Sequence, residues 1–381
     1  MYNCPMIPRR YDNLDEYVKP GEALVIYGPR QVGKTTLIKK YLETTEKKYR
    51  FDSGENIAIQ AVLSSQNFEQ ISRYVGNNEL IVIDEAQEIS GIGSGLKIIT
   101  DHHPHVSTIA TGSSSFDLAR NVGEPLVGRN TTVQLFPIAQ MEMLTNTDAF
   151  DLTQHLEDYL LFGSYPEVIN ANTHAEKIDY LEDMVNSYLL KDILALDNIK
   201  SPQSLVQLLK LLALQLGNEV SLNELGTQLG WDNKTVSRYL DLLEKCFVIV
   251  RLGAFSRNLR NEVTSKSKYY FLDNGIRNAI LQQFNPLDSR KDVGAIWENF
   301  LFIERLKWRS YSHTHSNSYF WRTYTQNEID LVEEHDGQLH GYEFKWALGK
   351  STKSKNAWMS SYDEASYKVV NQDNYLEFVT S

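Results

Sequence analysis

The sequence feature that most constrains this chain is the segment GPRQVGKT at residues 28–35. It follows an apolar run at residues 23–27 and precedes the helix-like segment TTLIKKYLE, so it fits G-x-x-x-x-G-K-[ST] in a strand–loop–helix setting. In this setting the glycines let backbone N–H groups surround anionic phosphates, and the positive end of the next helix adds to the attraction. The pattern predicts a phosphate-binding loop rather than a glycine-containing turn that happens to end in Lys-Thr.

The same loop predicts which residues meet the nucleotide. Lys34 is expected to reach the β- and γ-phosphates, and the Thr35 hydroxyl is expected to coordinate Mg²⁺. ATP and Mg²⁺ are therefore the expected cofactors. The predicted nucleotide-binding residues are Gly28, Pro29, Arg30, Gln31, Val32, Gly33, Lys34, Thr35 and Thr36.

A second segment, LIVIDE at residues 80–85, supplies the acidic strand that hydrolysis needs. Four consecutive apolar residues are typical of a strand buried on both faces of a parallel sheet. Asp84 is placed to hold Mg²⁺, through water or Thr35, and Glu85 is placed to polarise the attacking water. The alternative is a buried strand that merely ends in an acidic turn, and the loop upstream argues against it.

A third strand is predicted at residues 106–110 and ends in TGSS. Ser113 or Ser114 at its tip is expected to hydrogen-bond the attacking water or the γ-phosphate, although a serine-rich turn that caps the next helix is the alternative. Arg129 is a candidate for stabilising transition-state charge, in cis or across a subunit interface, or else a surface salt-bridge residue. A role across an interface would require a homo-oligomer.

The segments GPRQVGKTTL, IVIDEAQ, ATGSSSF and LVGR, in that order, resemble the AAA-family ATPases of bacteria and archaea that carry an uncharacterised C-terminal domain. Later segments, YPE at 165–167, YYFLD at 269–273 and EFK at 343–345, are similar to the same family, so the resemblance covers nearly the whole chain. It implies an ATPase. The later motifs identify the family but imply little about what the C-terminal region does.

Composition limits the partners and the compartment. A formal net charge of −11 argues against a protein that coats nucleic acid non-specifically, but it permits a local basic surface. The two cysteines, Cys4 and Cys246, provide neither a disulfide framework nor a zinc cluster, which fits a reducing cytoplasm. The N-terminus lacks the apolar core of a signal peptide, and no apolar run approaches membrane-spanning length. We therefore expect a cytoplasmic protein with no membrane partner.

The middle of the chain predicts a helical connector and then a winged helix. A capping-box start at Ser221 and Glu224 opens a short helix, and a second helix begins near Lys234. Strands at 247–252 and 268–272 flank a basic loop with Arg257, Arg260 and Lys266. This order is typical of a helix-turn-helix with a wing, which binds DNA in some proteins and docks proteins in others.

The tail predicts a site of the kind found in nucleases. Asp330 begins one hairpin strand, and Glu343 and Lys345 lie two apart near the end of the next, so the latter two share a face. With Glu298 on a preceding helix, they resemble the D…(D/E)-x-K core of restriction-endonuclease-like nucleases. In that chemistry Asp330, Glu343 and Glu298 would bind Mg²⁺, and Lys345 would orient the attacking water. The alternative is an edge strand with alternating charges, or a related fold that cuts nothing.

The sequence thus predicts an α/β chain: a P-loop parallel sheet with a helical lid, a winged helix and a restriction-endonuclease-like α/β domain. The expected function is ATP hydrolysis coupled to C-terminal domains that engage DNA. The alternative is a regulatory switch whose C-terminal domains bind protein partners without cleaving nucleic acid. The predicted boundaries are 1–140 for the ATPase, 141–203 for the connector, 204–275 for the winged helix and 276–381 for the nuclease-like domain.

Overall fold

The computed structural model describes residues 7–113, 126, 128–189, 193, 202–256, 266–347, 353–362 and 364–381. Contacts divide the chain into two compact units rather than four. The N-terminal unit comprises residues 8–137 with 245–247, and the C-terminal unit comprises 138–244 and 248–381 together with Ile7. Apart from residues 245–247, the described residues of the predicted connector, winged helix and nuclease-like domain therefore pack together in one unit.

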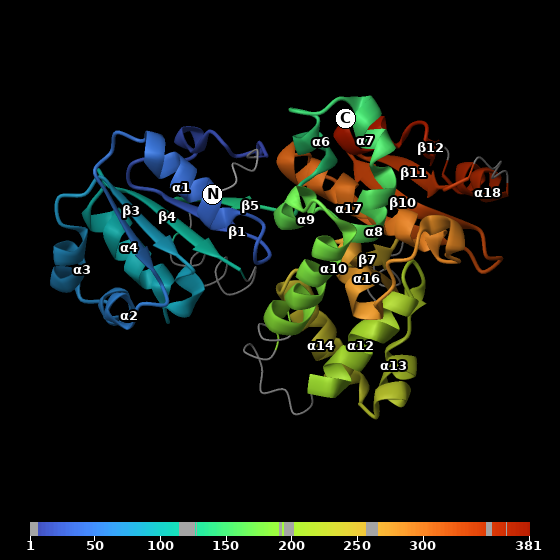
Figure 1. Cartoon of the computed structure of the whole chain (residues 1–381), viewed down its shortest axis with the longest axis horizontal. Helices are drawn as coiled ribbons and strands as arrows, with labels where there is room; N and C mark the ends of the chain where they lie inside the picture. Colours follow the sequence, from blue (N-terminus) through green and yellow to red (C-terminus); the bar gives the residue numbers. More distant parts are fainter. Residues whose placement is uncertain are drawn as a thin grey trace. The chain divides into compact units, whose positions relative to one another are not determined.

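The N-terminal unit is built on a five-stranded sheet in which all four strand pairs are parallel. Its strand order is β2-β3-β4-β1-β5, so β4 lies between the strand that precedes the P-loop and the acidic strand (Figure 1). The carboxyl ends of parallel strands meet at one edge, where ligands of such sheets bind. The strands are β1 Ala23–Tyr27, β2 Tyr49–Ser53, β3 Leu80–Asp84, β4 Ser107–Gly112 and β5 Asn130–Gln134.

Helices bury the central strands because those strands are apolar on both faces. Ile59 of α2, Ile71 of α3 and Leu96 of α4 pack in one core cluster with Val25 of β1 and Ile83 of β3. The asparagines before α2 and α3 accept backbone N–H bonds as N-caps, which fixes where these helices begin. The helical segments are η1 Leu14–Glu16, α1 Lys34–Thr44, α2 Ile57–Ser64, α3 Phe68–Val75, η2 Ala86–Glu88 and α4 Ile92–His102.

The C-terminal unit contains a seven-stranded mixed sheet with the order β12-β11-β10-β9-β7-β8-β6. Parallel pairing of Gly253 and Ala254 in β7 with Tyr319 and Phe320 in β9 joins the hairpin of the predicted wing to the strands of the predicted nuclease-like domain. The sheet therefore crosses the predicted boundary at 275/276 without a break. The strands are β6 Glu219–Val220, β7 Ile249–Ala254, β8 Ser267–Phe271, β9 Asn317–Arg322, β10 Glu328–His335, β11 Gln338–Phe344 and β12 Ser366–Val370.

Two of the helices of this unit, Val293–Tyr311 and Lys353–Ser361, contact strands of this sheet. None of the helices in the described ranges is both long and apolar enough to cross a membrane. The helical segments are α6 Gln140–Met143, α7 Ala149–Gln154, α8 Leu156–Phe162, α9 Pro166–Asn170, α10 His174–Asp183, the π-helix η3 Met184–Leu189, α12 Pro202–Leu214, α13 Leu222–Leu229, α14 Asn233–Lys245, α16 Asn274–Leu281, η4 Leu287–Ser289, α17 Val293–Tyr311, α18 Lys353–Ser361 and α19 Tyr375–Thr380.

The elements α13, α14, β7 and β8 follow one another in the order predicted for a helix-turn-helix with a hairpin, and α12 and the short strand β6, which was not predicted, precede them. The Ser221 hydroxyl accepts the Glu224 N–H and caps α13, and Gly230 ends that helix in the left-handed conformation. Arg257 and Arg260 of the predicted wing lie outside the described residues, whereas Lys266 is exposed. The winged-helix assignment itself stays a prediction.

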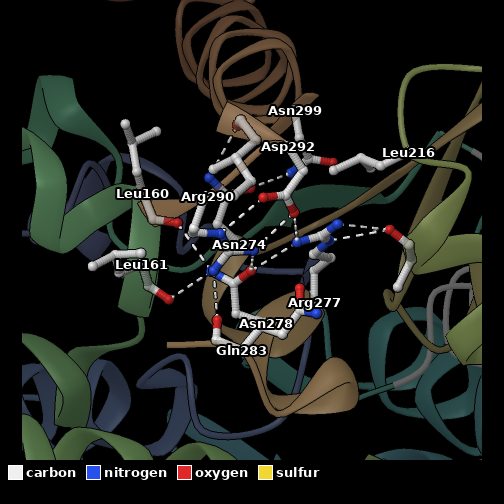
Figure 2. Close-up of polar contacts among 12 residues, drawn as sticks. Leu160, Leu161, Leu216, Asn274, Arg277, Asn278, Gln283, Arg290, Asp292 and Asn299 are labelled. Atoms are coloured by element: carbon white, nitrogen blue, oxygen red, sulfur yellow. Dashed lines mark hydrogen bonds and ion pairs between the residues drawn. The ribbon is translucent and has the colours of Figure 1, made fainter. Parts of the chain in front are cut away.

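Helix α16 is the polar centre of the C-terminal unit, and the predicted boundary at 275/276 falls inside it. Figure 2 shows Asn278 donating to the carbonyl oxygens of Leu160 and Leu161 at 3.2 and 2.8 Å, while Arg277 contacts Asp292 at 2.6 Å. These buried donors satisfy backbone and carboxylate groups of α8 and of the segment before α17. The hydrogen bonds tie helices from distant parts of the sequence into one unit.

Candidate functional site

The backbone of the P-loop is shaped by two glycines. Gly28 has φ = 149°, and a Cβ there would lie 2.0 Å from the Leu135 carbonyl oxygen, so no larger residue fits. Gly33 adopts the left-handed conformation with φ = 97° and serves as the N-cap of α1, which begins at Lys34. The loop therefore ends directly at a helix N-terminus, where unpaired N–H groups and the helix dipole attract anions.

Lys34 is held inside the curve of the loop. Its side chain is 5% exposed, and its ammonium donates to the carbonyl oxygens of Gly28 and Pro29 at 2.8 Å each. A buried ammonium that donates to carbonyl oxygens favours an incoming anion, because phosphate oxygens offer it stronger hydrogen bonds than neutral carbonyl groups do. This geometry suits the predicted contact with the β- and γ-phosphates.

The structure brings the acidic strand to the loop at the level of single hydrogen bonds. The Thr35 hydroxyl donates to one oxygen of Asp84 at 2.8 Å, and the Thr111 hydroxyl donates to the other. Thr111 also accepts the Glu85 N–H at 3.1 Å, and Glu85 sits in the left-handed conformation with φ = 50°. Residues from α1, β3 and β4 thus meet at one point, at the carboxyl edge of the sheet.

Two members of this site were not identified from the sequence. Thr111 is fully buried at the end of β4, and the Gln87 amide donates to the carboxylate of Glu85 and, at 3.3 Å, to the Ser113 hydroxyl. The signal for Thr111 was its position at the end of a buried strand next to the acidic strand. Gln87 carried no comparable signal, because an amide two residues after Glu85 matches no general pattern.

The remaining predicted residues of this half lie as follows. Ser113 is buried directly after β4, and its role stays a prediction, while Ser114 lies outside the described residues. Arg129 forms an ion pair with Asp101, and about half of its side chain is exposed. Within the chain, Arg129 is therefore engaged in the surface salt bridge that was the alternative interpretation of this residue.

The donor set of this half fits Mg²⁺ bound together with a nucleotide. Mg²⁺ prefers hard oxygen ligands and is commonly held by one or two carboxylates together with substrate phosphates. Asp84 with the hydroxyl of Thr35 provides such a partial set. Among the described residues no group of three His, Cys, Asp or Glu side chains is arranged to hold a metal ion.

The predicted C-terminal residues also come together, but around a cation that belongs to the chain. The ammonium of Lys268 on β8 lies 3.0 Å from Glu298 on α17 and 2.5 Å from Glu328 on β10. The Lys268 side chain is only 1% exposed, and the Tyr270 hydroxyl donates to the same Glu298 carboxylate at 2.6 Å. The Glu298 carboxylate is therefore paired with Lys268 and Tyr270 of the chain itself.

The other predicted metal ligands are likewise engaged. Asp330 accepts the Phe344 N–H at 2.7 Å, and burial together with the charge of Glu298 raises the pKa of its carboxyl to about 8, against the opposing effect of Lys268. Glu343 pairs with Lys345 at 2.8 Å and accepts a hydrogen bond from Tyr367. In this arrangement Lys268 pairs with Glu298 and Lys345 pairs with Glu343, and among the described residues the predicted metal set of Glu298, Asp330 and Glu343 is not arranged to hold a metal ion.

Comparisons with known proteins agree with the N-terminal assignment. Residues 20–144 match the family model of an AAA domain, which confirms an AAA-type P-loop ATPase domain in this part of the chain. Residues 153–287 and 293–380 match two domains of unknown function, DUF8612 and DUF4143. Neither of these two matches supports the winged-helix or the nuclease-like prediction.

Relatives that match most of the chain occur in bacteria and archaea. An uncharacterized protein of Mycobacterium tuberculosis is 26% identical over 349 residues, which cover 90% of this chain and 75% of that protein. An uncharacterized protein of Methanocaldococcus jannaschii is 24% identical over 305 residues, which cover 75% of this chain and 66% of that protein. A solved structure of AMPPCP-bound DnaA from Aquifex aeolicus is 16% identical, covers 62% of this chain and 84% of that chain, and has a TM-score of 0.28, too low to support an argument.

Proposed function

We propose that the N-terminal unit binds ATP with Mg²⁺ at residues 28–36 and hydrolyses it. The observation that carries this proposal is the junction of Thr35, Asp84 and Thr111 beside the buried ammonium of Lys34. Bound Mg²⁺ supplies Lewis-acid stabilisation of charge on the phosphate oxygens. Lys34 binds those oxygens, and Thr35 and Asp84 hold the metal.

Glu85 and Ser113 complete the proposed chemistry. Glu85 accepts a hydrogen bond from the attacking water and polarises it, while Ser113 hydrogen-bonds the water or the γ-phosphate. The Gln87 amide, which contacts both side chains, keeps them at the same end of the sheet. Arg129 would stabilise transition-state charge only after leaving Asp101, and across a subunit interface only in a homo-oligomer.

The proposal is tested with Lys34→Ala in the purified full chain, with Lys40→Ala as the matched control. Lys40 lies on the same helix but pairs with Asp12 at the surface. We expect Lys34→Ala to lower ATP turnover by about a hundredfold or more, since it removes a preorganised cation from the phosphates, and we expect Lys40→Ala to change little. Unchanged turnover in Lys34→Ala would overturn the assignment.

We further propose that the C-terminal unit engages DNA through α14 and the hairpin β7–β8. The support is the order of these elements and the exposure of Lys234, Arg238, Arg251 and Lys266. Phosphate contacts by such residues make binding weaken steeply as salt increases. One residue argues against DNA binding by this helix: the acidic side chain of Asp241 is exposed on α14 as well.

A second candidate is a switch that binds a protein partner and cuts no nucleic acid, and the buried Lys268 favours it over a nuclease. One experiment separates the candidates: ATP turnover and DNA integrity are followed with single-stranded, duplex and branched DNA in Mg²⁺ and in Mn²⁺. Stimulation of turnover by one DNA form, lost in Lys234→Ala/Arg238→Ala, supports engagement of DNA. No response to any form favours the protein-binding switch. DNA cleavage that is lost in the double variant Asp330→Ala/Lys345→Ala would instead support the nuclease hypothesis.

A further inference from the structure

Arg9, in the segment before β1, contacts the P-loop and the end of the N-terminal unit at once. One terminal nitrogen of its guanidinium donates to the carbonyl oxygen of Val32, and the other donates to the carbonyl oxygen of Phe136 at 2.6 Å. A planar guanidinium with several donors in a fixed geometry is suited to such a bridge, whereas a lysine ammonium lacks that fork. The loop and the strand exit are therefore joined through one side chain.

The Val32 carbonyl is a sensitive point of the loop. In a planar trans peptide the carbonyl of residue 32 and the N–H of residue 33 point in opposite directions. By holding the Val32 carbonyl, Arg9 fixes the direction of the Gly33 N–H, at the N-terminus of α1, where a phosphate is attracted. A phosphate that pulls on this N–H must turn the same peptide plane and so acts on the Arg9 contact.

Residues 135 and 136 lie against the other end of the loop as well. The Leu135 N–H donates to the Tyr27 carbonyl at 2.8 Å, and the Leu135 carbonyl oxygen occupies the space beside Gly28. Phe136 itself is buried. This short segment thus touches both ends of the P-loop, directly at Gly28 and through Arg9 at Val32.

The chain leaves the N-terminal unit immediately after these contacts. Phe136 is followed by Pro137, whose ring restricts the backbone, and then by Ile138, the first residue of the C-terminal unit along this part of the chain. Within that unit the Ile138 N–H donates to the Ser164 carbonyl at 2.8 Å, and the Ile138 carbonyl accepts from Lys307 at 3.3 Å. A single proline therefore separates two anchored stretches of backbone.

We propose that Arg9 is a positioning residue that couples nucleotide binding at the P-loop to the backbone of residues 136–140, and through it to the C-terminal unit. This inference rests on the proposed ATP binding. Nucleotide binding turns the peptide between Val32 and Gly33, and Arg9 transmits this movement to the Phe136 carbonyl. The restricted backbone of Pro137 then passes the movement on to Ile138. Gln140 continues the path, since its N–H donates to the buried Glu304 carboxylate at 2.7 Å.

The distribution of tryptophan provides a direct readout. All six tryptophans lie between residues 231 and 358, in the C-terminal unit, and none lies in the unit that holds the P-loop. We expect saturating Mg²⁺ with a non-hydrolysable ATP analogue to change the tryptophan emission of the wild-type full chain. Hydrogen exchange of peptides covering 136–142, measured in parallel, is expected to slow on binding.

The variants are Arg9→Ala and Arg9→Lys, with Arg10→Ala as the control. Nucleotide binding, measured by equilibrium dialysis, should weaken by no more than about tenfold in the Arg9 variants, as expected for loss of one or two hydrogen bonds. At saturation, their emission change and their protection at 136–142 should fall to less than half of the wild-type values, while Arg10→Ala keeps both. Arg9→Lys keeps the charge and guards against a folding failure of Arg9→Ala.

Three outcomes would overturn the inference. The first is a full emission and exchange response in both Arg9 variants at saturating nucleotide. The second is a wild-type chain that binds the analogue with no change in either signal, which leaves the proposed function intact. The third is a wild-type chain that binds no nucleotide, which overturns the proposed function as well.

Discussion

Thr111 shows how much of the candidate site depends on single hydroxyl groups. It contacts the last residue of β3 and the residue that follows, donating to Asp84 and accepting from the Glu85 N–H, and it is fully buried. Its neighbour on the same strand, Thr108, is also fully buried, but its hydroxyl has no hydrogen-bond partner within the described structure. Two threonines on one strand therefore have different roles.

This difference gives a matched pair of variants. We expect Thr111→Val to lower the ATPase kcat by about 10–100-fold, because groups that orient metal ligands carry effects of this size. Thr108→Val should leave kcat within about twofold, since no hydrogen bond is lost. Steady-state turnover at saturating Mg²⁺-ATP is the measurement, and equal effects of the two variants would contradict the role of Thr111.

The contacts of Lys268 could not be predicted from the sequence. The sequence pattern of Asp330, Glu343 and Lys345 predicts a metal site, and Asp330 and Glu343 do lie on the paired strands β10 and β11, with Lys345 directly after β11. Lys268 precedes Asp330 by more than sixty residues, and no spacing rule connects it with that motif or with Glu298. Only the pairing of strands and helices shows that its ammonium sits among the carboxylates.

At the scale of elements, α17 is held by a buried ion pair. Glu304 and Lys307 lie one helical turn apart, 2.6 Å from each other, and both are almost completely buried. Burial raises the pKa of the Glu304 carboxyl, while Lys307 and the Gln140 N–H oppose that shift. Lys307 also donates to the Ser164 hydroxyl at 3.0 Å, so this pair joins α17 to the segment before α6 and to the turn before α9.

Removing one partner of this pair should be far more harmful than removing both. We expect Lys307→Met to lower the free energy of unfolding by about 3–5 kcal/mol, because it leaves the Glu304 charge buried without compensation. Lys307→Met/Glu304→Gln should recover part of that loss. Lys368→Met, at an exposed pair with Glu377, is the control and should cost no more than about 1 kcal/mol.

Urea titration followed by tryptophan emission measures these changes, because every tryptophan reports the C-terminal unit. If Lys307→Met were no more destabilising than Lys368→Met, the buried pair would not be holding α17.

At the scale of the molecule, the two compact units predict two unfolding events. Far-UV circular dichroism follows both units, whereas tryptophan emission follows only the C-terminal one. We expect a nucleotide concentration about 100 times its Kd to stabilise the N-terminal unit by about 2.7 kcal/mol. The unfolding transition of this unit, seen by circular dichroism, should therefore shift more than the transition seen by tryptophan emission. The shift should vanish in Lys34→Ala. A single transition, coincident for both probes and moved equally by nucleotide, would show instead that the units unfold as one.

The sequence by itself predicted the parallel sheet of the N-terminal unit and its phosphate loop to a large extent. Residues 28–35 and 80–85 carry local signals, because a phosphate loop and an acidic buried strand are each written in consecutive residues. It also predicted the order of helices and strands from α13 to β8, since capping residues and hydrophobic periodicity act within a few positions. These elements needed no knowledge of distant contacts.

The tertiary structure alone decided which distant residues meet. It placed Thr111 on Asp84, Lys268 among the predicted metal ligands and Arg9 between Val32 and Phe136. It also joined β7 to β9, so that one sheet spans two predicted domains. Strand pairing and side-chain packing link residues far apart in the chain, and their register depends on the whole core rather than on any local pattern. For that reason the phosphate loop and the acidic strand could be predicted from the sequence, whereas the contact partners of their residues could be identified only in the structure.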